Sequence, residues 1–222
     1  MQRHFDEELK GIHKEILKMG AFAQEAIFKS VESLMNRDKN QAQEVISIDD
    51  KIDELELIID EHCIDLIARH QPMASDLRFI TTGMKINAEL ERIADLAVDI
   101  CQRVLELVNK PLLKPLIDTP KLGAIAQEMV RDAIDAFVNK DVELAKKVVN
   151  SDVAADKLRN LIADELINDY MSKDPTTADR AVPLLLIARH LERICDHATN
   201  IAEDVIYMVE AKVVKHHHEE LK

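Results

Sequence analysis

The sequence predicts an all-α protein made of two tandem, repeat-related three-helix bundles with six long helices in total. Three observations lead to this fold class. The chain of 222 residues has only 4 Gly and 6 Pro, too few turn-forming residues for an all-β sandwich or a doubly wound α/β fold. Apolar residues recur every three or four positions, which is the period of a helix that buries one face. The two halves of the chain also resemble each other.

Capping and turn residues divide the chain into six helices, expected over residues 4–36, 39–70, 73–108, 119–138, 141–171 and 175–212. Asp38 with Gln41 predicts a capping box at the start of the second helix. Proline-containing breaks and further caps mark the other boundaries, at Gln71-Pro72, Pro111, Pro115, Thr119-Pro120, Asp141 and Asp174-Pro175. Pro183 lies inside the sixth helix and predicts a kink or a late start there.

The internal repeat is visible in matching segments. Asn36-Arg37-Asp38 corresponds to Asn139-Lys140-Asp141 at an offset of 103, and the segment 90–95 corresponds to 191–196 at an offset of 101. We therefore expect a first three-helix bundle at 1–108, a linker at 109–118, a second bundle at 119–212 and a charged tail at 213–222 that contains His216, His217 and His218.

Charge and cysteine usage narrow the function classes. The net charge of −13 disfavours binding to nucleic acid or broad adhesion to an anionic membrane. No run reaches the roughly 18 apolar residues of a membrane-spanning helix, and no apolar signal region follows Met1. Cys63, Cys101 and Cys195 are far apart and predict buried thiols in a reducing compartment. We therefore expect a cytoplasmic protein without membrane insertion.

Four acidic pairs with a spacing of four residues are the candidate functional groups, at Asp49/Asp53, Glu91/Asp95, Asp152/Asp156 and Glu192/Asp196. A spacing of four places both acids on one face of a helix, where like charges destabilise it by about 0.2–0.5 kcal/mol. In an antiparallel hairpin, two residues are level when they are equally far from the turn. The pairs of the first half are equidistant from Pro72, and those of the second half from Asp174. We therefore expect four carboxylates to converge in each bundle.

Converging carboxylates need protons, basic side chains or metal ions between them. Oxygen-only ligands suit Mg²⁺, Ca²⁺, Mn²⁺ or iron, so a cation site is the prediction. The alternative is a solvated acidic surface paired with Arg92, Arg193 and nearby lysines. No Glu-x-x-His pair supports a ferritin-like di-iron site, and no P-loop, GxSxG or HExxH motif indicates an enzyme.

Several segments resemble the signature segments of the PhoU family of bacterial phosphate-signalling regulators, and the resemblance covers nearly the whole chain. These segments are Asp49-x-x-Ile52-Asp53, Gln71-Pro72-x-Ala74-x-Asp76-Leu77-Arg78, Leu90-Glu91-Arg92-Ile93-x-Asp95 and the run from Leu191 to Glu203. The resemblance implies a non-enzymatic, cytoplasmic accessory protein of the phosphate-specific transport system that is peripheral to the inner membrane through its partners.

The same resemblance implies negative regulation of the phosphate-starvation response and of phosphate uptake. The partners it implies are the ATPase subunit of a phosphate ABC transporter and the sensor histidine kinase of a phosphate two-component system, with homodimerisation. It also implies multinuclear iron or zinc on the acidic pairs, with Mn, Mg or Ca as alternatives. Asp99, Asn200 and Glu203 are expected to extend the two rows of ligands, and Asp76 and Arg78 match a segment at a proposed partner surface.

Two alternatives to the regulator remain open from the sequence. The carboxylates could form the multi-metal centre of a hydrolase, which needs an open coordination position and a cleft. They could instead belong to a metal-buffering or structural bundle that has no kinase or ATPase partner. For Asp76 and Arg78, the alternative is an ion pair within one helix that stabilises the start of the third helix.

Overall fold

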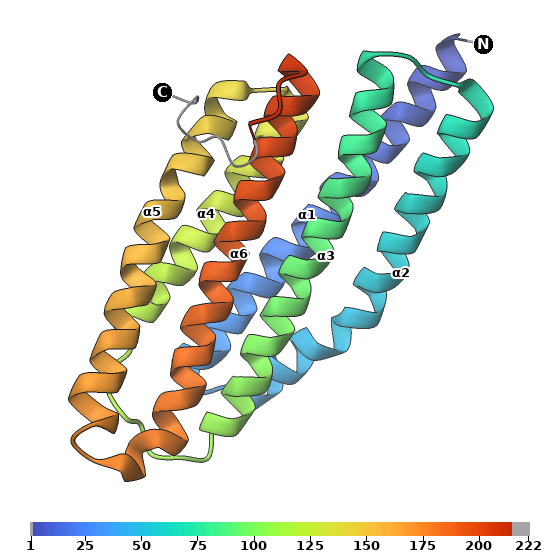
Figure 1. Ribbon diagram of the computed structural model, residues 1–222. Coiled ribbons are helices and arrows are strands. Elements are labelled where there is room, and N and C mark those ends of the chain that lie inside the picture. Colours follow the sequence, from blue (N-terminus) through green and yellow to red (C-terminus); the bar gives the residue numbers. More distant parts are fainter. Residues whose placement is uncertain (1, 215–222) are drawn as a thin grey trace.

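The computed structural model describes residues 2–214, with side chains from residue 4 onward, and shows six long helices without a strand in that range (Figure 1). The prediction of an all-α fold is confirmed. Among the described residues, no helix is long and apolar enough to cross a membrane. The elements are α1 (Gln2–Asn36), α2 (Lys39–His70), α3 (Ser75–Leu107), α4 (Asp118–Asn139), α5 (Val142–Glu165), the π-helical turn η1 (Leu166–Met171), the 3₁₀ turn η2 (Pro175–Thr177) and α6 (Ala178–Glu210).

The junctions after α1 and α4 have the same geometry, which confirms the internal repeat in three dimensions. Arg37 and Lys140 are left-handed, with φ of 54° and 53°. The next residue, Asp38 or Asp141, donates its backbone N–H to the carbonyl five positions earlier at 2.9 Å, as in a Schellman motif. Each aspartate then caps the following helix with its side chain.

Two of the predicted capping interactions are wrong in detail. Asp38 accepts hydrogen bonds from the N–H groups of Asn40 and Gln41, but the Gln41 side chain bonds to Glu32, so the capping box is only half formed. Thr119 is not an N-cap, because α4 begins one residue earlier and Thr119 is buried. No side-chain hydrogen bond caps the start of α4.

The sixth helix continues through Pro183 after the 3₁₀ turn η2. Asp174 caps this start by accepting a hydrogen bond from Thr176 N at 3.0 Å, as the sequence predicts. Pro183 has no N–H, so the carbonyl of Asp179 has no donor one turn later in the helix. Lys110 Nζ donates to this carbonyl at 2.8 Å, which ties the segment after α3 to the start of α6.

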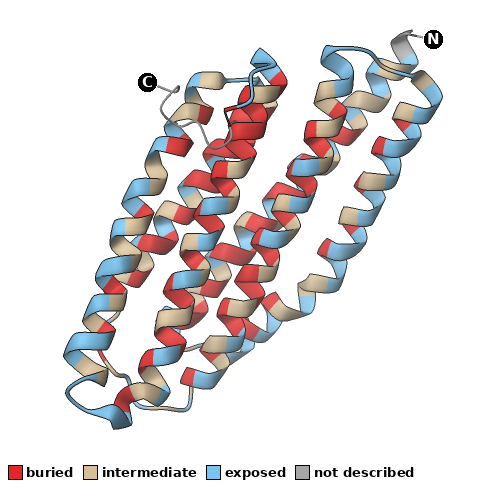
Figure 2. Ribbon diagram, viewed as in Figure 1, coloured by how far each residue is buried: buried red, intermediate tan, exposed pale blue. Residues whose placement is uncertain are grey.

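Each bundle is built around its third helix, and Figure 2 shows the buried residues concentrated where α3 and α6 face their neighbours. The apolar stripe of α3 is buried throughout, at Leu90, Ile93, Ala97, Cys101 and Val104. Burial of a Leu, Ile or Val side chain contributes about 1.5–3 kcal/mol. α1 and α2 pack on α3, and α4 and α5 pack on α6. The acid-bearing faces of α2 and α5 are thereby held beside α3 and α6.

The two bundles meet through α3 on α6 and α1 on α4. Two glycines at an offset of 103 make the second contact possible. A Cβ on Gly20 would lie 2.5 Å from Ile134 Cδ1, and one on Gly123 would lie 2.8 Å from Val31 Cγ2. Ile134 and Val31 are also related by an offset of 103. The α1–α4 contact therefore has approximate two-fold symmetry.

Polar contacts between α3 and α6 add to this interface. Lys85 Nζ lies 2.8 Å from a carboxylate oxygen of Asp204, and Glu89 lies 2.5 Å from His197 Nδ1. The pairs run in opposite directions along the two helices, which are therefore antiparallel. The interface fixes how the two bundles, and the acidic groups they carry, are oriented.

The region 109–118, predicted as a linker, is packed against both bundles. The Arg37 guanidinium donates to the carbonyl oxygens of Leu107 at 3.1 Å, of Val108 at 2.8 Å and of Lys110. These bonds hold the end of α3 against α1, and the Leu107 carbonyl also accepts from the backbone N–H of Lys110 at 3.0 Å. Lys114 is buried and pairs with Glu165 at the end of α5. The predicted tail residues His216, His217 and His218 lie outside the described residues.

The α1–α4 packing predicts opposite effects for two glycine substitutions. Gly123→Ala should destabilise the protein by about 1–2 kcal/mol, because the branched Val31 cannot easily move away from a new methyl group. Gly11→Ala, with nothing within 4 Å of its added Cβ, should instead stabilise α1 by up to about 1 kcal/mol. Urea unfolding followed by circular dichroism measures both, and equal effects of the two substitutions would contradict the packing described.

Candidate metal centre

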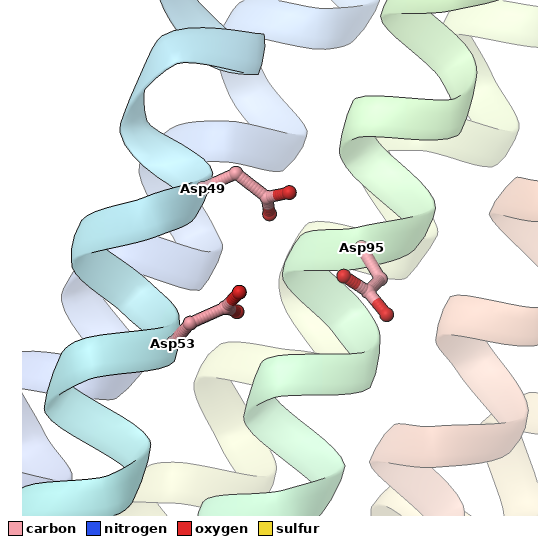
Figure 3. Close-up of side chains that lie close together, drawn as sticks. All are labelled: Asp49, Asp53 and Asp95. Atoms are coloured by element: carbon pink, nitrogen blue, oxygen red, sulfur yellow. The ribbon is translucent and has the colours of Figure 1, made fainter.

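Three carboxylates of the first bundle converge between α2 and α3. Asp49 and Asp53 lie one turn apart on α2 and point toward Asp95 on α3 (Figure 3). Each offers a carboxylate oxygen, and these oxygens lie within 4.8 Å of one another. The turn between the helices makes this possible, because Gln71 and Ala74 adopt positive φ values of 46° and 50° and reverse the chain. The sequence predicts four converging carboxylates in this bundle, and three of them, Asp49, Asp53 and Asp95, meet in this way, with Glu91 outside the group.

The negative charges of this first cluster are only weakly balanced by hydrogen-bond donors or nearby cations. Asp49 Oδ1 is buried and has no hydrogen-bond partner among the described residues. Burial, and then the charges of Asp53 and Asp95, raise the pKa of Asp49. Burial and the neighbouring Asp95 also raise the pKa of Glu91 to about 7. Such groups favour a proton or a bound cation over separate ionised carboxylates.

Two further acidic residues border the first cluster. Burial, followed by the charges of Asp60 and Asp53, raises the pKa of Glu56 on α2. Asp99, one turn beyond Asp95, adds to the negative field at Asp49 and lies 3.8 Å from His190 Nδ1 on α6. Arg92 lies 3.5 Å from Asp95, but its side chain is 63% exposed, so water and salt screen its charge. The cluster is therefore strongly acidic.

The second bundle brings its four acids to the corresponding place, but the charges around them differ from those in the first bundle. Burial, and then Glu192 and Asp156, raise the pKa of Asp196. Asp152 belongs to the same group, as the buried Cys195 thiol shows. Burial raises the pKa of this thiol most, and the charges of Asp152 and of the other three acids raise it further. Within the described part of the chain, only the first bundle brings three such ligand atoms within 4.8 Å.

A cation of the protein itself lies in this second cluster. Arg159 Nη2 is 3.1 Å from Glu192 Oε1 and 3.9 Å from Asp156 Oδ1. Arg92 and Arg193 were expected as partners of the acids, whereas neither Arg159 nor Glu56 was expected at the clusters. An alignment of the two halves at an offset of 103 would have found them, because it places Arg159 opposite Glu56.

Two residues expected to extend the second row have contacts or surroundings of their own, and a ligand role for them stays a prediction. The Asn200 amide donates to both carboxylate oxygens of Glu89 on α3, at 3.3 and 3.2 Å, and so belongs to the interface between the bundles. Glu203 is buried beside a hollow lined by Lys85, Asp204 and Tyr207. Helix periodicity predicted their face but not the approach of α3, which supplies Glu89 as a partner of the Asn200 amide.

Asp76 and Arg78, the predicted partner surface, lie at the start of α3. Arg78 Nε donates to the carbonyl of Met208 near the end of α6 at 3.2 Å, so the arginine ties two helix ends together. Asp76 is exposed in the first turn, where a negative charge is favoured by the helix dipole. Arg78 therefore has a structural contact, and a role in partner binding stays a prediction for both residues.

The donor set of the first cluster fits a hard cation. It consists of carboxylate oxygens from two helices, one of them buried without a partner, and the convergence is close enough for shared coordination. Asp49, Asp53 and Asp95 would hold the ion, with Glu91 and Glu56 beside them. A bound cation would offset the repulsion between these groups and connect α2 to α3.

Sequence comparisons identify the family. The family profile described as the PhoU domain matches residues 16–104 and, a second time, residues 119–205. The chain belongs to the PhoU family. It is 42% identical over 211 residues to the phosphate-specific transport system accessory protein PhoU homolog of Aquifex aeolicus, covering 95% of each chain. It is 35% identical over 221 residues to PhoU homolog 2 of Thermotoga maritima, covering 100% of this chain and 94% of the relative.

Solved structures of the PhoU family have the same fold. The crystal structure of PhoU from Pseudomonas aeruginosa superimposes with a TM-score of 0.90 at 37% identity, covering 94% of this chain and 100% of that one. A phosphate transport system regulatory protein PhoU from Streptococcus pneumoniae gives a TM-score of 0.88 at 28% identity, with 95% and 99% coverage. The two family matches and these structures support the tandem arrangement of two PhoU repeats.

The raised pKa of Glu91 predicts a pH-dependent stability in the metal-free protein. The folded state holds the Glu91 proton more tightly than the unfolded chain, whose value is 4.5, so this contribution to stability is lost as pH rises toward about 7. Glu91→Gln should remove that loss and make the protein more stable by about 1 kcal/mol at about pH 8, after allowance for solvent screening.

Chemical unfolding in EDTA at pH values on both sides of this range measures the effect. Glu106→Gln is the matched control, because Glu106 lies on α3 outside the cluster and pairs with Arg103. A Glu91→Gln variant whose stability followed the same pH profile as the parent would contradict the described environment of Glu91.

Proposed function

We propose that this protein regulates phosphate uptake as an accessory component of the phosphate-specific transport system, without catalysing a reaction itself. The observation that carries the proposal is the match of both halves to the PhoU domain, with relatives named as accessory proteins over nearly the full chain. In the proposal, the protein acts as a negative regulator of the phosphate-starvation response.

The proposed partners are the ATPase subunit of the phosphate transporter and the sensor histidine kinase of the phosphate two-component system. A rigid scaffold of paired helices suits this role, since two bundles in a fixed orientation offer two related surfaces. The protein would act in the cytoplasm, reach the inner membrane through these partners and form a homodimer. Direct binding to nucleic acid is disfavoured by the net charge of −13.

The acidic clusters are proposed to bind metal, with multinuclear iron or zinc favoured and Mn, Mg or Ca as alternatives. The fit of three converging carboxylates in the first bundle supports this proposal. A bound cation would connect the second and third helices of a bundle and reduce the negative potential of that surface. Metal would in this way set the shape and charge that a partner meets.

Binding of the two partners tests the proposal. The purified protein should bind both the transporter ATPase subunit and the kinase, and Glu91→Gln with Glu192→Gln should weaken both complexes by about tenfold or more, since each change removes a charged ligand. Biolayer interferometry with immobilised partner domains measures the affinities. Glu106→Gln with Glu210→Gln is the control, because these acids lie on the same helices outside the clusters.

Three other outcomes separate the proposal from its alternatives. A double variant that took up no metal but kept full partner affinity would remove metal from the mechanism. Absence of binding to either partner, with metal still bound, would favour the metal-buffering bundle. Turnover of phosphoesters by the Mn²⁺-loaded protein, lost in the Glu91→Gln variant, would favour the hydrolase.

A further inference from the structure

The two acidic clusters differ by a reversal of charge at the equivalent positions Glu56 and Arg159; another reversal at the offset of 103, Glu54 to Lys157, lies on the exposed side of the two helices. An offset of 103 relates Asp49 to Asp152 and Asp53 to Asp156, and the same offset relates Glu56 to Arg159. These residues lie one turn apart on α2 and α5, on the faces that pack beside α3 and α6. The repeat has therefore kept the acids and changed the sign of their neighbour.

In the first cluster this position increases the negative charge. Glu56 is half-buried, and burial followed by the charges of Asp60 and Asp53 raises its pKa. Its carboxylate adds to the negative electrostatic potential that Asp49 and Asp95 create. The arginine nearest to this cluster, Arg92, is 63% exposed and so neutralises it only weakly.

In the second cluster the same position supplies a cation. Arg159 is 34% exposed, and its guanidinium lies 3.1 Å from Glu192 and 3.9 Å from Asp156. It thus engages one acid from each of the two helices, as a bridging metal ion would. A guanidinium also donates in directions that match carboxylate oxygens, so it is a strong competitor for them.

Arg159 has room to leave this position. A cavity of about 520 Å³ lies beside the second cluster and is lined by Arg159, Ala163, Leu185, Arg189 and Glu192, among others. Arg159 Nε is buried and has no hydrogen-bond partner among the described residues. Apart from the acids, the guanidinium contacts Asn160, whose exposed Oδ1 accepts a hydrogen bond from Arg159 Nη1 at 2.6 Å. The cavity gives the side chain space beside the acids.

We infer that the two clusters bind cations with unequal affinity and that Arg159 sets the difference, so that the first bundle fills before the second. A cation entering the second cluster must displace the guanidinium from Glu192 and Asp156. In the first cluster Glu56 adds attraction instead. The inference rests on the metal-binding part of the proposed function, and it goes beyond it by assigning an order of occupancy and a residue that controls it.

Another difference between the halves acts in the same direction. Asp99 adds to the negative field at Asp49, whereas the second half has the neutral Asn200 at the equivalent position, with its amide bonded to Glu89 on α3. Arg92 and Arg193 occupy equivalent positions in the two halves, so an arginine at that position is common to both clusters. The Glu56/Arg159 reversal is the difference that touches the acids directly.

Calorimetric titration of the metal-free full-length chain with Mn²⁺ tests the inference. His216, His217 and His218 are changed to Ala in all samples so that the tail cannot bind Mn²⁺. The parent should show two classes of site whose affinities differ by at least about tenfold, given the strength of a nearby charge. Glu91→Gln should weaken the tight class, and Glu192→Gln the weak class.

The decisive variants alter the charge reversal itself. Arg159→Glu should tighten the weak class by at least about tenfold, with Arg159→Gln intermediate because it removes a charge without adding a ligand. The double variant Glu56→Arg with Arg159→Glu keeps the net charge and should invert the order of filling. Arg189→Glu is the matched control, because it makes the same change in charge in the same cavity without a contact to the acids.

Each outcome supports or overturns the inference. Two equal classes of site in the parent, or equal effects of Arg159→Glu and Arg189→Glu, would overturn it while leaving metal binding intact. Absence of any Mn²⁺ binding in the parent would overturn both the inference and the metal-binding part of the proposed function. Circular dichroism of each variant checks that helix content is kept.

Discussion

The antiparallel packing of α3 on α6 is the contact on which the rest of the structure depends. Each of these helices forms the core of its own bundle with one face and the interface between bundles with another. Their stripes are buried almost completely, and the polar pairs Lys85–Asp204 and Glu89–His197 fix the register between them. Because α2 and α5 are packed against this central pair, the acids on all four helices are held at fixed positions. Each cluster, made from two helices, needs this support, since like charges alone would separate them.

The sequence predicts the repeat, and the height along the helices at which the acids meet, because both depend on short-range patterns. The αL residues Arg37 and Lys140 and the caps Asp38 and Asp141 follow from local backbone chemistry. The convergence of Asp49, Asp53 and Asp95 follows from helix period and equal distance from the turn at Pro72. These relations involve one hairpin at a time, so no knowledge of the tertiary structure is needed.

Contacts between the bundles escape such reasoning. Asn200 was assigned to the second cluster because of its helical face, and the structure shows that α3 supplies Glu89 as its partner. Gly20 and Gly123 carry no signal of their own, although they allow α1 and α4 to approach. Thr119 looks like an N-cap until its burial is known. Arg159 lies between these cases, since aligning the repeats exposes the charge reversal but only the structure shows its contact with Glu192.

Eight of the carboxylates behind the net charge of −13 form two groups on a scaffold that holds them together. We propose that these groups bind cations in the protein as the cell makes it. Elemental analysis of protein purified without chelators or a metal-affinity tag tests this claim most directly. The account predicts bound metal that is lost when Asp49, Asp53 and Asp95 are changed to Asn, with helix content unchanged. Metal-free protein with full helix content, and no uptake of iron, zinc or manganese on addition, would contradict it.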